Sequence, residues 1–315
     1  MNPNERGYSM NNTTYKNPVC AGADPFVLLA DGQYWHYSTN DPEGYRVQVS
    51  DDLVHWEDRG YCLHKNDVKG EKWFWAPEIL ALDGKYYMVY TADEHLGLAV
   101  ADTPAGPFVQ TKKEWLSEKN AIDGHFHIAP DGAVYLYYVR FDRGNVIYGV
   151  RLADSTASFA QLAAAGDLRI DETAEVRLME TEEEWETHMG RVAEGPFVLR
   201  HGGKYYLTYS ANDYQSPRYA IGYAVSDEPL GPYRKYPGNP ILQRKEPITG
   251  VGHHSFTTSK DGSRLVCVYH CHNSLTAIHP RLTCIDPAEF LPAENGDDVL
   301  VIHGPTSAPQ PGLAE

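Results

Sequence analysis

The feature that most constrains the fold is internal repetition, because one short sequence unit recurs five times along the chain. Each copy carries a polar residue near its start, an apolar run, a turn with glycine and an aromatic-rich run. The copies start at Ala23, Ala76, Ala121, Ala193 and Gly252, and their turns are Asp31-Gly32, Asp83-Gly84, Asp131-Gly132, Gly202-Gly203 and Asp261-Gly262. Asp-Gly and Gly-Gly between alternating apolar runs are strong signals for a β-hairpin. The repeats therefore predict five hairpins.

A second pair of short strands follows each hairpin. Copies two and four share the pattern A-V-[AS]-D-x-P-x-G-P-[FY], and copy one has the related run YRVQVSDDLVHWEDRG. Four strands over roughly 50 residues is the size of a β-propeller blade. We therefore predict an all-β fold, a single five-bladed β-propeller domain over residues 1–315. The predicted blades span about residues 18–70, 71–118, 119–165, 190–245 and 246–303.

Two segments depart from the repeat. Residues 160–192 are rich in alanine and then acidic, which predicts a loop with a short helix inserted before the fourth blade. The acidic run Glu182 to Glu184 is interpreted as the solvated face of that helix. The Pro-rich tail after His303 is expected to be loose.

Charge excludes some classes of partner. Lys and Arg number 27 and Asp and Glu 43, so the formal charge is −16. A nucleic-acid binder usually carries a basic stripe, and an anionic membrane attracts basic residues, so neither partner is expected. No apolar run is long enough for a membrane span, and the N-terminal residues lack the apolar centre of a secretory signal. The five scattered cysteines suggest free thiols, and we expect a cytoplasmic protein.

Polar residues recur near the start of the first strand of every blade, where that strand lines the central channel. They are Asp24, Glu78, Asp123, Glu194 and either His253 or His254. We expect these side chains to occupy one structural position around the ring and to converge on one pocket. Converging carboxylates either bind a hard cation or share protons across a reacting bond. Two carboxylates with separated pKa values suit cleavage of a glycosidic bond.

Aromatic residues near these positions offer flat surfaces for a sugar. They are Trp73, Phe74, Trp75 and Phe126. Packing in the core between blades is the alternative for each of them.

The motifs ADPFV, WAPEI, IDGHF, EGPFV with GKYYLTYS, and GVGHHSF resemble glycoside hydrolase family 43 over about residues 20–290. The resemblance implies a five-bladed propeller of inverting arabinofuranosidases, xylosidases and arabinanases. It implies that Asp24 is the general base and Glu194 the general acid. Asp123 would then tune the pKa of the acid and hold its orientation. An inverting mechanism would place the carboxylates of Asp24 and Glu194 roughly 6.5–9.5 Å apart.

The same resemblance suggests residues that bind sugar or metal. Arg281 matches an arginine that reaches the sugar or Asp123, and Trp75, Phe126 and His254 are further candidates for sugar contacts. His253 matches an axial histidine that lies near a central calcium ion or its waters. No cofactor is expected to be required for the chemistry, but a structural Ca²⁺ at the propeller axis is a prediction.

The expected activity is removal of non-reducing-end α-L-arabinofuranosyl residues from plant cell-wall oligosaccharides. The third motif departs from the family pattern, which more often reads Asp-Pro or Asp-Ala than Asp123-Gly124. Many β-xylosidases of the family carry a C-terminal β-sandwich, which this sequence is too short to hold, so arabinofuranosides are favoured. A β-D-xylosidase on the same site and a non-catalytic sugar-binding propeller remain the alternatives. Each would have an arabinose- or xylose-containing oligosaccharide as its partner.

Two further motifs are interpreted as structural. NDPEG at Asn40 imitates the nucleophile motif of fructan and sucrose hydrolases, but it follows a strand where that motif starts one, so a loop is favoured. CVYHCH from Cys267 suggests zinc. On a strand, however, its cysteines and its histidines face opposite sides, so they cannot share one ion. The cysteines are interpreted as small buried apolar residues.

Overall fold

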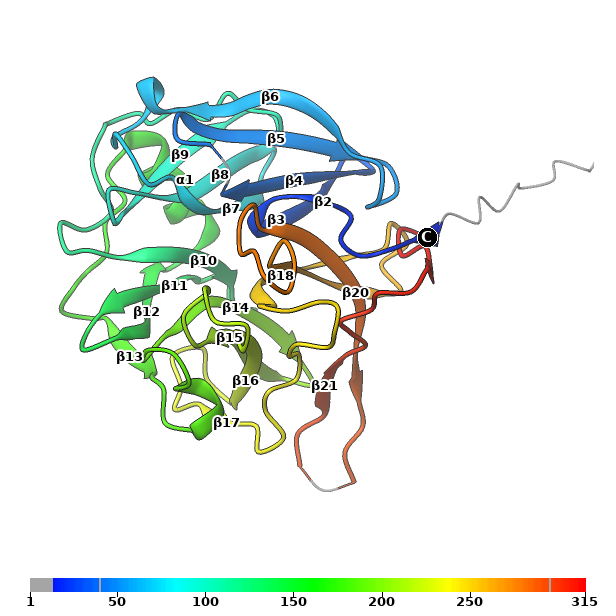
Figure 1. The fold of residues 1–315 in the computed structure, drawn as a ribbon. Coiled ribbons are helices and arrows are strands. Elements are labelled where there is room, and N and C mark those ends of the chain that lie inside the picture. Colours follow the sequence, from blue (N-terminus) through cyan, green and yellow to red (C-terminus); the bar gives the residue numbers. More distant parts are fainter. Residues whose placement is uncertain (1–13, 40, 295) are drawn as a thin grey trace, which may run out of the picture.

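The computed structural model describes residues 14–39, 41–294 and 296–315. It shows a five-bladed β-propeller, in which five antiparallel sheets surround a central axis (Figure 1). The first blade contains β3 (Ala23–Ala30), β4 (Gln33–Thr39), β5 (Gly44–Ser50) and β6 (Glu57–His64). The second contains β7 (Trp75–Leu82), β8 (Lys85–Ala92) and β9 (His95–Ala101). The third contains β10 (Ile122–Ile128), β11 (Val134–Phe141), β12 (Asn145–Ala153) and β13 (Val176–Met179).

The other two blades complete the ring. The fourth contains β14 (Ala193–His201), β15 (Lys204–Ala211), β16 (Ala220–Ser226) and β17 (Arg234–Lys235). The fifth contains β18 (Gly252–Thr258), β19 (Leu265–Cys271), β20 (Leu282–Leu291) and β2 (Cys20–Ala21), with β21 (Val299–Ile302) on the far end of β20. Each predicted hairpin pairs the first two strands of a blade. The five-bladed prediction is therefore confirmed.

Both chain ends take part in closing the ring, which the sequence reading did not predict. Strand β2, assigned above to the first blade, pairs with β20 and forms the outer strand of the fifth blade. The tail after His303 was expected to be loose, and that expectation was wrong. Strand β22 (Gln310–Pro311) pairs with β1 (Thr14–Tyr15), and Leu313 is buried. The tail is ordered because it covers apolar side chains at the junction of the first and fifth blades.

The predicted short helix exists, but it lies inside the third blade. Helix α1 (Thr156–Ala165) connects β12 to β13, so this blade extends beyond the predicted boundary at residue 165. Its N-cap Ser155 accepts from the backbone N–H of Ser158. The acidic run leads into the one-turn helix η2 (Glu184–Glu186), where Glu182 and Glu184 are exposed as expected.

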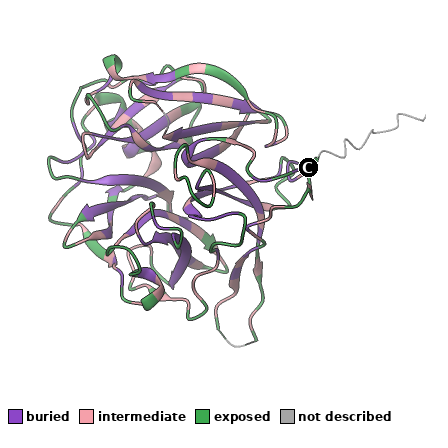
Figure 2. Ribbon diagram, viewed as in Figure 1, coloured by how far each residue is buried: buried purple, intermediate pink, exposed green. Residues whose placement is uncertain are grey.

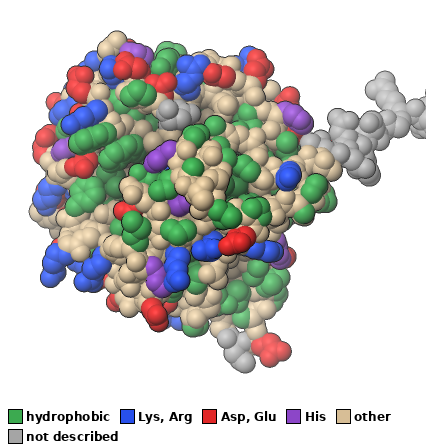
Figure 3. Space-filling view, viewed as in Figure 1, with side chains coloured by type: hydrophobic (Ala, Val, Ile, Leu, Met, Phe, Trp, Pro, Cys, Tyr) green, Lys and Arg blue, Asp and Glu red, His purple; other side chains and the backbone are tan. Residues whose placement is uncertain are grey.

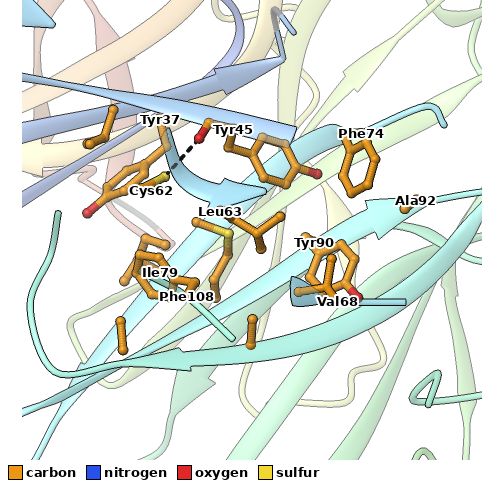
Figure 4. Close-up of a cluster of buried hydrophobic side chains, with 14 of the residues drawn as sticks. Tyr37, Tyr45, Cys62, Leu63, Val68, Phe74, Ile79, Tyr90, Ala92 and Phe108 are labelled. Atoms are coloured by element: carbon orange, nitrogen blue, oxygen red, sulfur yellow. Dashed lines mark hydrogen bonds between the residues drawn. The ribbon is translucent and has the colours of Figure 1, made fainter. Parts of the chain in front are cut away.

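Tyrosines fill much of the space between blades, which explains why the sequence holds 22 of them. Burial follows the inner strands of all five sheets (Figure 2). In the cluster between the first two blades, Tyr37, Tyr45 and Tyr90 are fully buried (Figure 4). Their hydroxyl groups donate to the carbonyl oxygens of Pro104 at 2.6 Å, Trp75 at 2.9 Å and Lys69 at 2.8 Å, respectively. A buried tyrosine thus contributes apolar area without leaving its hydroxyl unpaired.

The cysteines behave as predicted. All five are free, four of them are buried, and Cys20 is partly buried. Among the described residues, no group of three or more His, Cys, Asp and Glu side chains is placed to hold a metal ion, so CVYHCH is no zinc site. Asn40 of the NDPEG motif lies outside the described residues. Its neighbour Asp41 accepts from the backbone of Glu43 and from Tyr61, as expected for a loop.

A buried carboxylate, Asp286 on β20, joins the ring closure to both chain ends. It accepts hydrogen bonds from Tyr269, Tyr15, Asn17 and Thr306. Tyr15 and Asn17 precede the first blade and Thr306 belongs to the tail. One carboxylate therefore holds three separate segments together.

We expect Asp286→Ala to destabilise the fold by about 3 kcal/mol, because it leaves several buried donors without an acceptor. Chemical denaturation of the full chain measures this. The exposed Asp227→Ala is the matched control and should cost less than about 0.5 kcal/mol. Equal losses for the two variants would show that Asp286 does not secure the closure.

Candidate active site

A β-bulge near the start of every inner strand shapes the site. At each bulge the pairing register shifts, and one residue takes a left-handed backbone conformation. These residues and their φ angles are Asp24 (50°), Ala76 (41°), Asp123 (58°), Gly195 (55°) and His253 (43°). Left-handed φ is costly for residues other than glycine and concentrates at functional sites.

The bulges correct the prediction that five polar residues share one structural position. Asp24, Asp123 and His253 do occupy equivalent positions. Glu194 lies one residue before its bulge, and Glu78 lies two residues after its own. Glu78 instead joins two blades, since it accepts from the backbone N–H of Phe126 at 2.9 Å and lies 2.8 Å from Nδ1 of His125.

The backbone N–H of each bulge donates to a side chain of the preceding blade. In three blades the acceptor is a hydroxyl, and the pairs are Ala76 with Thr39, Asp123 with Thr91, and His253 with Ser210. The other two acceptors belong to the site itself. Asp24 donates to Nδ1 of His270 at 3.2 Å, and Gly195 donates to Oδ2 of Asp123 at 3.2 Å. In the other four blades the acceptor lies on the second strand, opposite the residue that precedes the bulge. In the third blade this position holds Val139, whose side chain cannot accept, and Asp123 is the acceptor instead.

The three predicted carboxylates lie in one pocket of about 320 Å³. Its walls include Asp24, Asp123 and Glu194, together with Trp75, His253 and Arg281. The three carboxylates are buried, and they come from the first, third and fourth blades. Convergence on one pocket is therefore found for these three carboxylates and His253, whereas Glu78, which was also expected there, does not line it.

Asp24 is surrounded by nitrogen. Arg281 donates to both of its oxygens, at 2.7 and 3.2 Å, and Nδ1 atoms of His253 and His270 lie 3.3 and 3.2 Å from Oδ1. Nδ1 of His270 accepts the backbone N–H of Asp24, so this nitrogen does not donate to the carboxylate. Burial alone would raise the pKa of Asp24, but Arg281, and then His253, hold it well below its usual value. Asp24 is therefore ionised at neutral and mildly acidic pH.

The pKa of Glu194 is shifted in the opposite direction from that of Asp24. Tyr219 donates to Oε1 at 2.9 Å and Asn145 donates to Oε2 at 2.9 Å. Burial raises the pKa of Glu194 to about 7, and the negative charge of Asp24 adds to that effect, while the two hydrogen bonds oppose it. Glu194 therefore carries a proton below about pH 7, where Asp24 is ionised.

Asp123 is linked to the acid through the backbone, because Gly195, whose N–H it accepts, directly follows Glu194. Burial raises the pKa of Asp123 well above its usual value, and the charges of Glu194 and Asp24 add to the effect. Asp123 and Glu194 therefore titrate as a pair.

Tyr219→Phe should move the alkaline limb of the pH profile to higher pH. The hydroxyl donates to the ionised carboxylate, so its loss favours the protonated acid and raises the pKa of Glu194. We expect a shift of about one pH unit, from the usual strength of a hydrogen bond to a charged group. The measurement is kcat/KM against pH on an aryl glycoside.

Tyr206→Phe is the control for this experiment. It also removes a tyrosine hydrogen bond in the fourth blade, to the carbonyl oxygen of Asp298 at 2.7 Å, without touching the site. An unmoved limb in Tyr219→Phe, or the same shift in both variants, would refute the role of Tyr219.

Two predicted sugar contacts lie elsewhere. Phe126 is in the core, where its ring meets Phe159 of α1 edge-on, because it points away from the pocket after the bulge. His254 is buried, and its Nε2 lies 2.6 Å from Oγ1 of Thr208 on β15. Neither lines the substrate pocket, so both assignments were wrong.

Phe74, also a candidate for stacking on a sugar, is buried in the cluster between the first two blades, whereas Trp75 and Arg281 line the pocket. Trp75 stacks on the more exposed Trp73, with ring centroids 5.8 Å apart. Arg281 lies on Asp24, whereas the sequence reading placed it near the sugar or Asp123.

A calcium ion at the axis fits the described residues poorly. The small axial cavity beside His253, of about 20 Å³, has room for about one water molecule. Calcium prefers oxygen ligands, but both oxygens of Glu78 are already engaged and Arg281 would repel a cation near Asp24. The axial calcium stays a prediction.

Sequence reasoning missed several residues of the site. Tyr219, Asn145 and His270 contact the acid or the base, and Asp213 and Tyr214 form part of the pocket wall. The polar and aromatic loop SANDYQSPRY, between β15 and β16, carries three of these five residues and could have suggested them.

Among the described residues, no helix is long and apolar enough to cross a membrane.

Known proteins resemble this chain in sequence and in fold. The profile of the family described as Glycosyl hydrolases family 43 matches residues 15–294. The crystal structure of a thermostable family-43 glycoside hydrolase superimposes with a TM-score of 0.83 and 38% identity, covering 95% of this chain and 99% of that one. A β-D-galactofuranosidase from Aspergillus niger is 26% identical, covering 89% of this chain and 83% of its own length. A xylosidase/arabinosidase from Bacteroides ovatus is 25% identical, with coverage of 67% and 75%.

Proposed function

This chain belongs to glycoside hydrolase family 43, and we propose that it is an inverting enzyme that removes non-reducing-end α-L-arabinofuranosyl residues from plant cell-wall oligosaccharides. One observation carries the proposal. A single pocket holds one buried carboxylate whose pKa lies well below its usual value and another whose pKa is about 7. Such a pair supplies a base and an acid at the same pH.

Asp24 acts as the general base. It takes a proton from a water molecule, which attacks the anomeric carbon from the face opposite the leaving group. Arg281 and His253 keep Asp24 ionised, and its low pKa also makes it a weaker base. Proton transfer is most efficient when the pKa of the base lies near the working pH.

Glu194 acts as the general acid and protonates the departing oxygen. Its raised pKa means that activity is present below about pH 7 and is lost as the pH rises through that value. Asp123 holds the backbone beside the acid through the N–H of Gly195. Because the charges of the two groups interact, we infer that Asp123 also contributes to the pH at which the acid titrates.

The substrate is proposed from two kinds of support. The relatives are named for activities on arabinosides, xylosides and galactofuranosides, which supports the proposal of a pentose or a furanose ring at the cleaved end. The pocket presents Trp75 as a flat surface beside the carboxylates, which suits a sugar face. A β-D-xylosidase on the same site is the second candidate, because one relative is named for both activities.

Hydrolysis of matched aryl glycosides tests the proposal. We expect the highest kcat/KM on the α-L-arabinofuranoside, with lower values on the β-D-xyloside and the β-D-galactofuranoside. A faster xyloside would favour the second candidate. Binding of the sugars without hydrolysis of any aryl glycoside would indicate a non-catalytic sugar-binding propeller instead.

A further inference from the structure

A second cavity, polar and about 370 Å³ in volume, adjoins the active-site pocket. Its walls are the turn between β11 and β12, residues 142–145, and residues near β13 and β14 that include Arg177, Glu180 and Arg191. Asn145 lines both cavities. Phe141 and Val192 line the active-site pocket, whereas their sequence neighbours Asp142 and Arg191 line the polar cavity.

The polar cavity lies beside the proposed general acid. Asn145 separates the two, since its amide donates to Oε2 of Glu194 at 2.9 Å while the same residue lines the polar cavity. A general acid must reach the glycosidic oxygen, so the leaving group emerges on the side of Glu194. The sugar that follows the cleaved bond is therefore directed toward the polar cavity.

The polar cavity carries one more basic than acidic side chain. Three arginines and two carboxylates line it, on a protein whose net charge is −16. Acidic and basic side chains both occur on the face seen in Figure 3. Arg177 donates one hydrogen bond to the carboxylate of Asp142 and another to the carboxylate of Glu180.

Arg143 and Arg191 are held less closely. Their nearest carboxylate oxygens, on Asp142 and Glu180, lie 3.7 and 3.8 Å away, beyond ordinary hydrogen-bond distance. Their side chains are 87% and 63% exposed. Two arginines with largely exposed side chains thus line the cavity, where a ligand can reach them.

The backbone fixes these two arginines relative to one another. Arg143 adopts a left-handed φ of 56°, and the N–H of Asn145 donates to the carbonyl oxygen of Arg191 at 2.9 Å. A Cβ on Gly144 would lie 2.3 Å from that same carbonyl oxygen, so only glycine allows the close approach. The turn is therefore built against Arg191.

We propose that this cavity, with Arg143 and Arg191, binds the carboxylate of a uronic acid in the leaving group. The planar guanidinium group matches a carboxylate through paired hydrogen bonds. The inference rests on the proposed function and narrows it, because the substrate becomes an acidic oligosaccharide with a pentose at its non-reducing end. Without such a cationic site, the net negative charge of the protein would disfavour an anionic substrate.

The test compares two substrates that differ only in charge. One is an arabinofuranosyl oligosaccharide whose next sugar is a hexuronic acid, and the other is its methyl ester. For the wild-type enzyme we expect kcat/KM to be about tenfold higher for the acid than for the ester at low salt, from two exposed ion pairs. The preference should weaken as salt is added.

The double variant Arg143→Ala/Arg191→Ala should lower the acid-to-ester ratio to near one. Arg151→Ala is the control, because that arginine lies on β12 of the same blade and pairs with Asp154 away from the cavity. It should keep the wild-type ratio. Thermal unfolding and the kcat/KM on the ester show whether the double variant is folded.

The outcomes separate this inference from the proposed function. Equal rates on acid and ester in the wild type, or an unchanged ratio in the double variant, would overturn the uronate site and leave the glycosidase intact. If the wild type hydrolyses neither compound, the proposed function fails. Calorimetric binding of the acid and the ester then decides the site, with tighter binding of the acid supporting it and equal binding refuting it.

Discussion

Asp24→Ala is expected to lose about 10²–10⁴-fold in kcat/KM, or more, on every substrate. The base must deprotonate the attacking water whichever group departs, so activated aryl glycosides and natural oligosaccharides should suffer alike. The measurement is kcat/KM on one substrate of each kind. Asp51→Ala, an exposed aspartate of the same blade, is the control and should keep wild-type activity.

The loss must be separated from damage to the pocket, because removal of Asp24 leaves Arg281 buried without its carboxylate. Asp24→Asn keeps the size of the side chain and should be as inactive as the alanine variant. Near-normal activity of Asp24→Asn in a folded protein would contradict the role of general base.

Glu194→Ala should show a loss that depends on the leaving group. An oligosaccharide is a poor leaving group and needs the proton, so kcat/KM should fall by about 10²–10⁴-fold. An aryl glycoside with an acidic phenol departs without help and should lose far less. The alkaline limb near pH 7, which reports the acid, should also disappear.

Glu184→Ala provides the matched control, since Glu184 is an exposed glutamate on η2. Its pH profile should match that of the wild type. Equal losses on good and poor leaving groups in Glu194→Ala would show that another residue is the acid.

The ring of five hairpins could be predicted from sequence because each turn is encoded locally by Asp-Gly or Gly-Gly. The outer strands of the third and fifth blades could not, since they are short and do not directly follow their partner strands in sequence. Strand β2 pairs with Thr283 and Leu282, and β13 follows a helix. The tail after His303 was expected to be loose because the sequence does not show that Thr306 donates to Asp286.

The carboxylates of the site could be identified from sequence because they recur near the start of the repeats. Their positions relative to one another could not be predicted. A bulge inserts a residue at a place that simple alternation cannot reveal, and every side chain after it changes face. Phe126 and His254 follow such bulges, which is why both were assigned to the pocket and lie elsewhere. Tyr219 and Asn145 come from other strands and loops, and only the folded ring brings them to Glu194.

The stereochemistry of the first product tests the central claim most directly. Hydrolysis of an aryl α-L-arabinofuranoside, or of the β-D-xyloside if that is the better substrate, can be followed by proton NMR before the released sugar mutarotates. With Asp24 as base and Glu194 as acid, the sugar should appear first with the anomeric configuration opposite to that of the substrate. A first product of the same configuration would mean a covalent intermediate and would contradict the mechanism derived from this site.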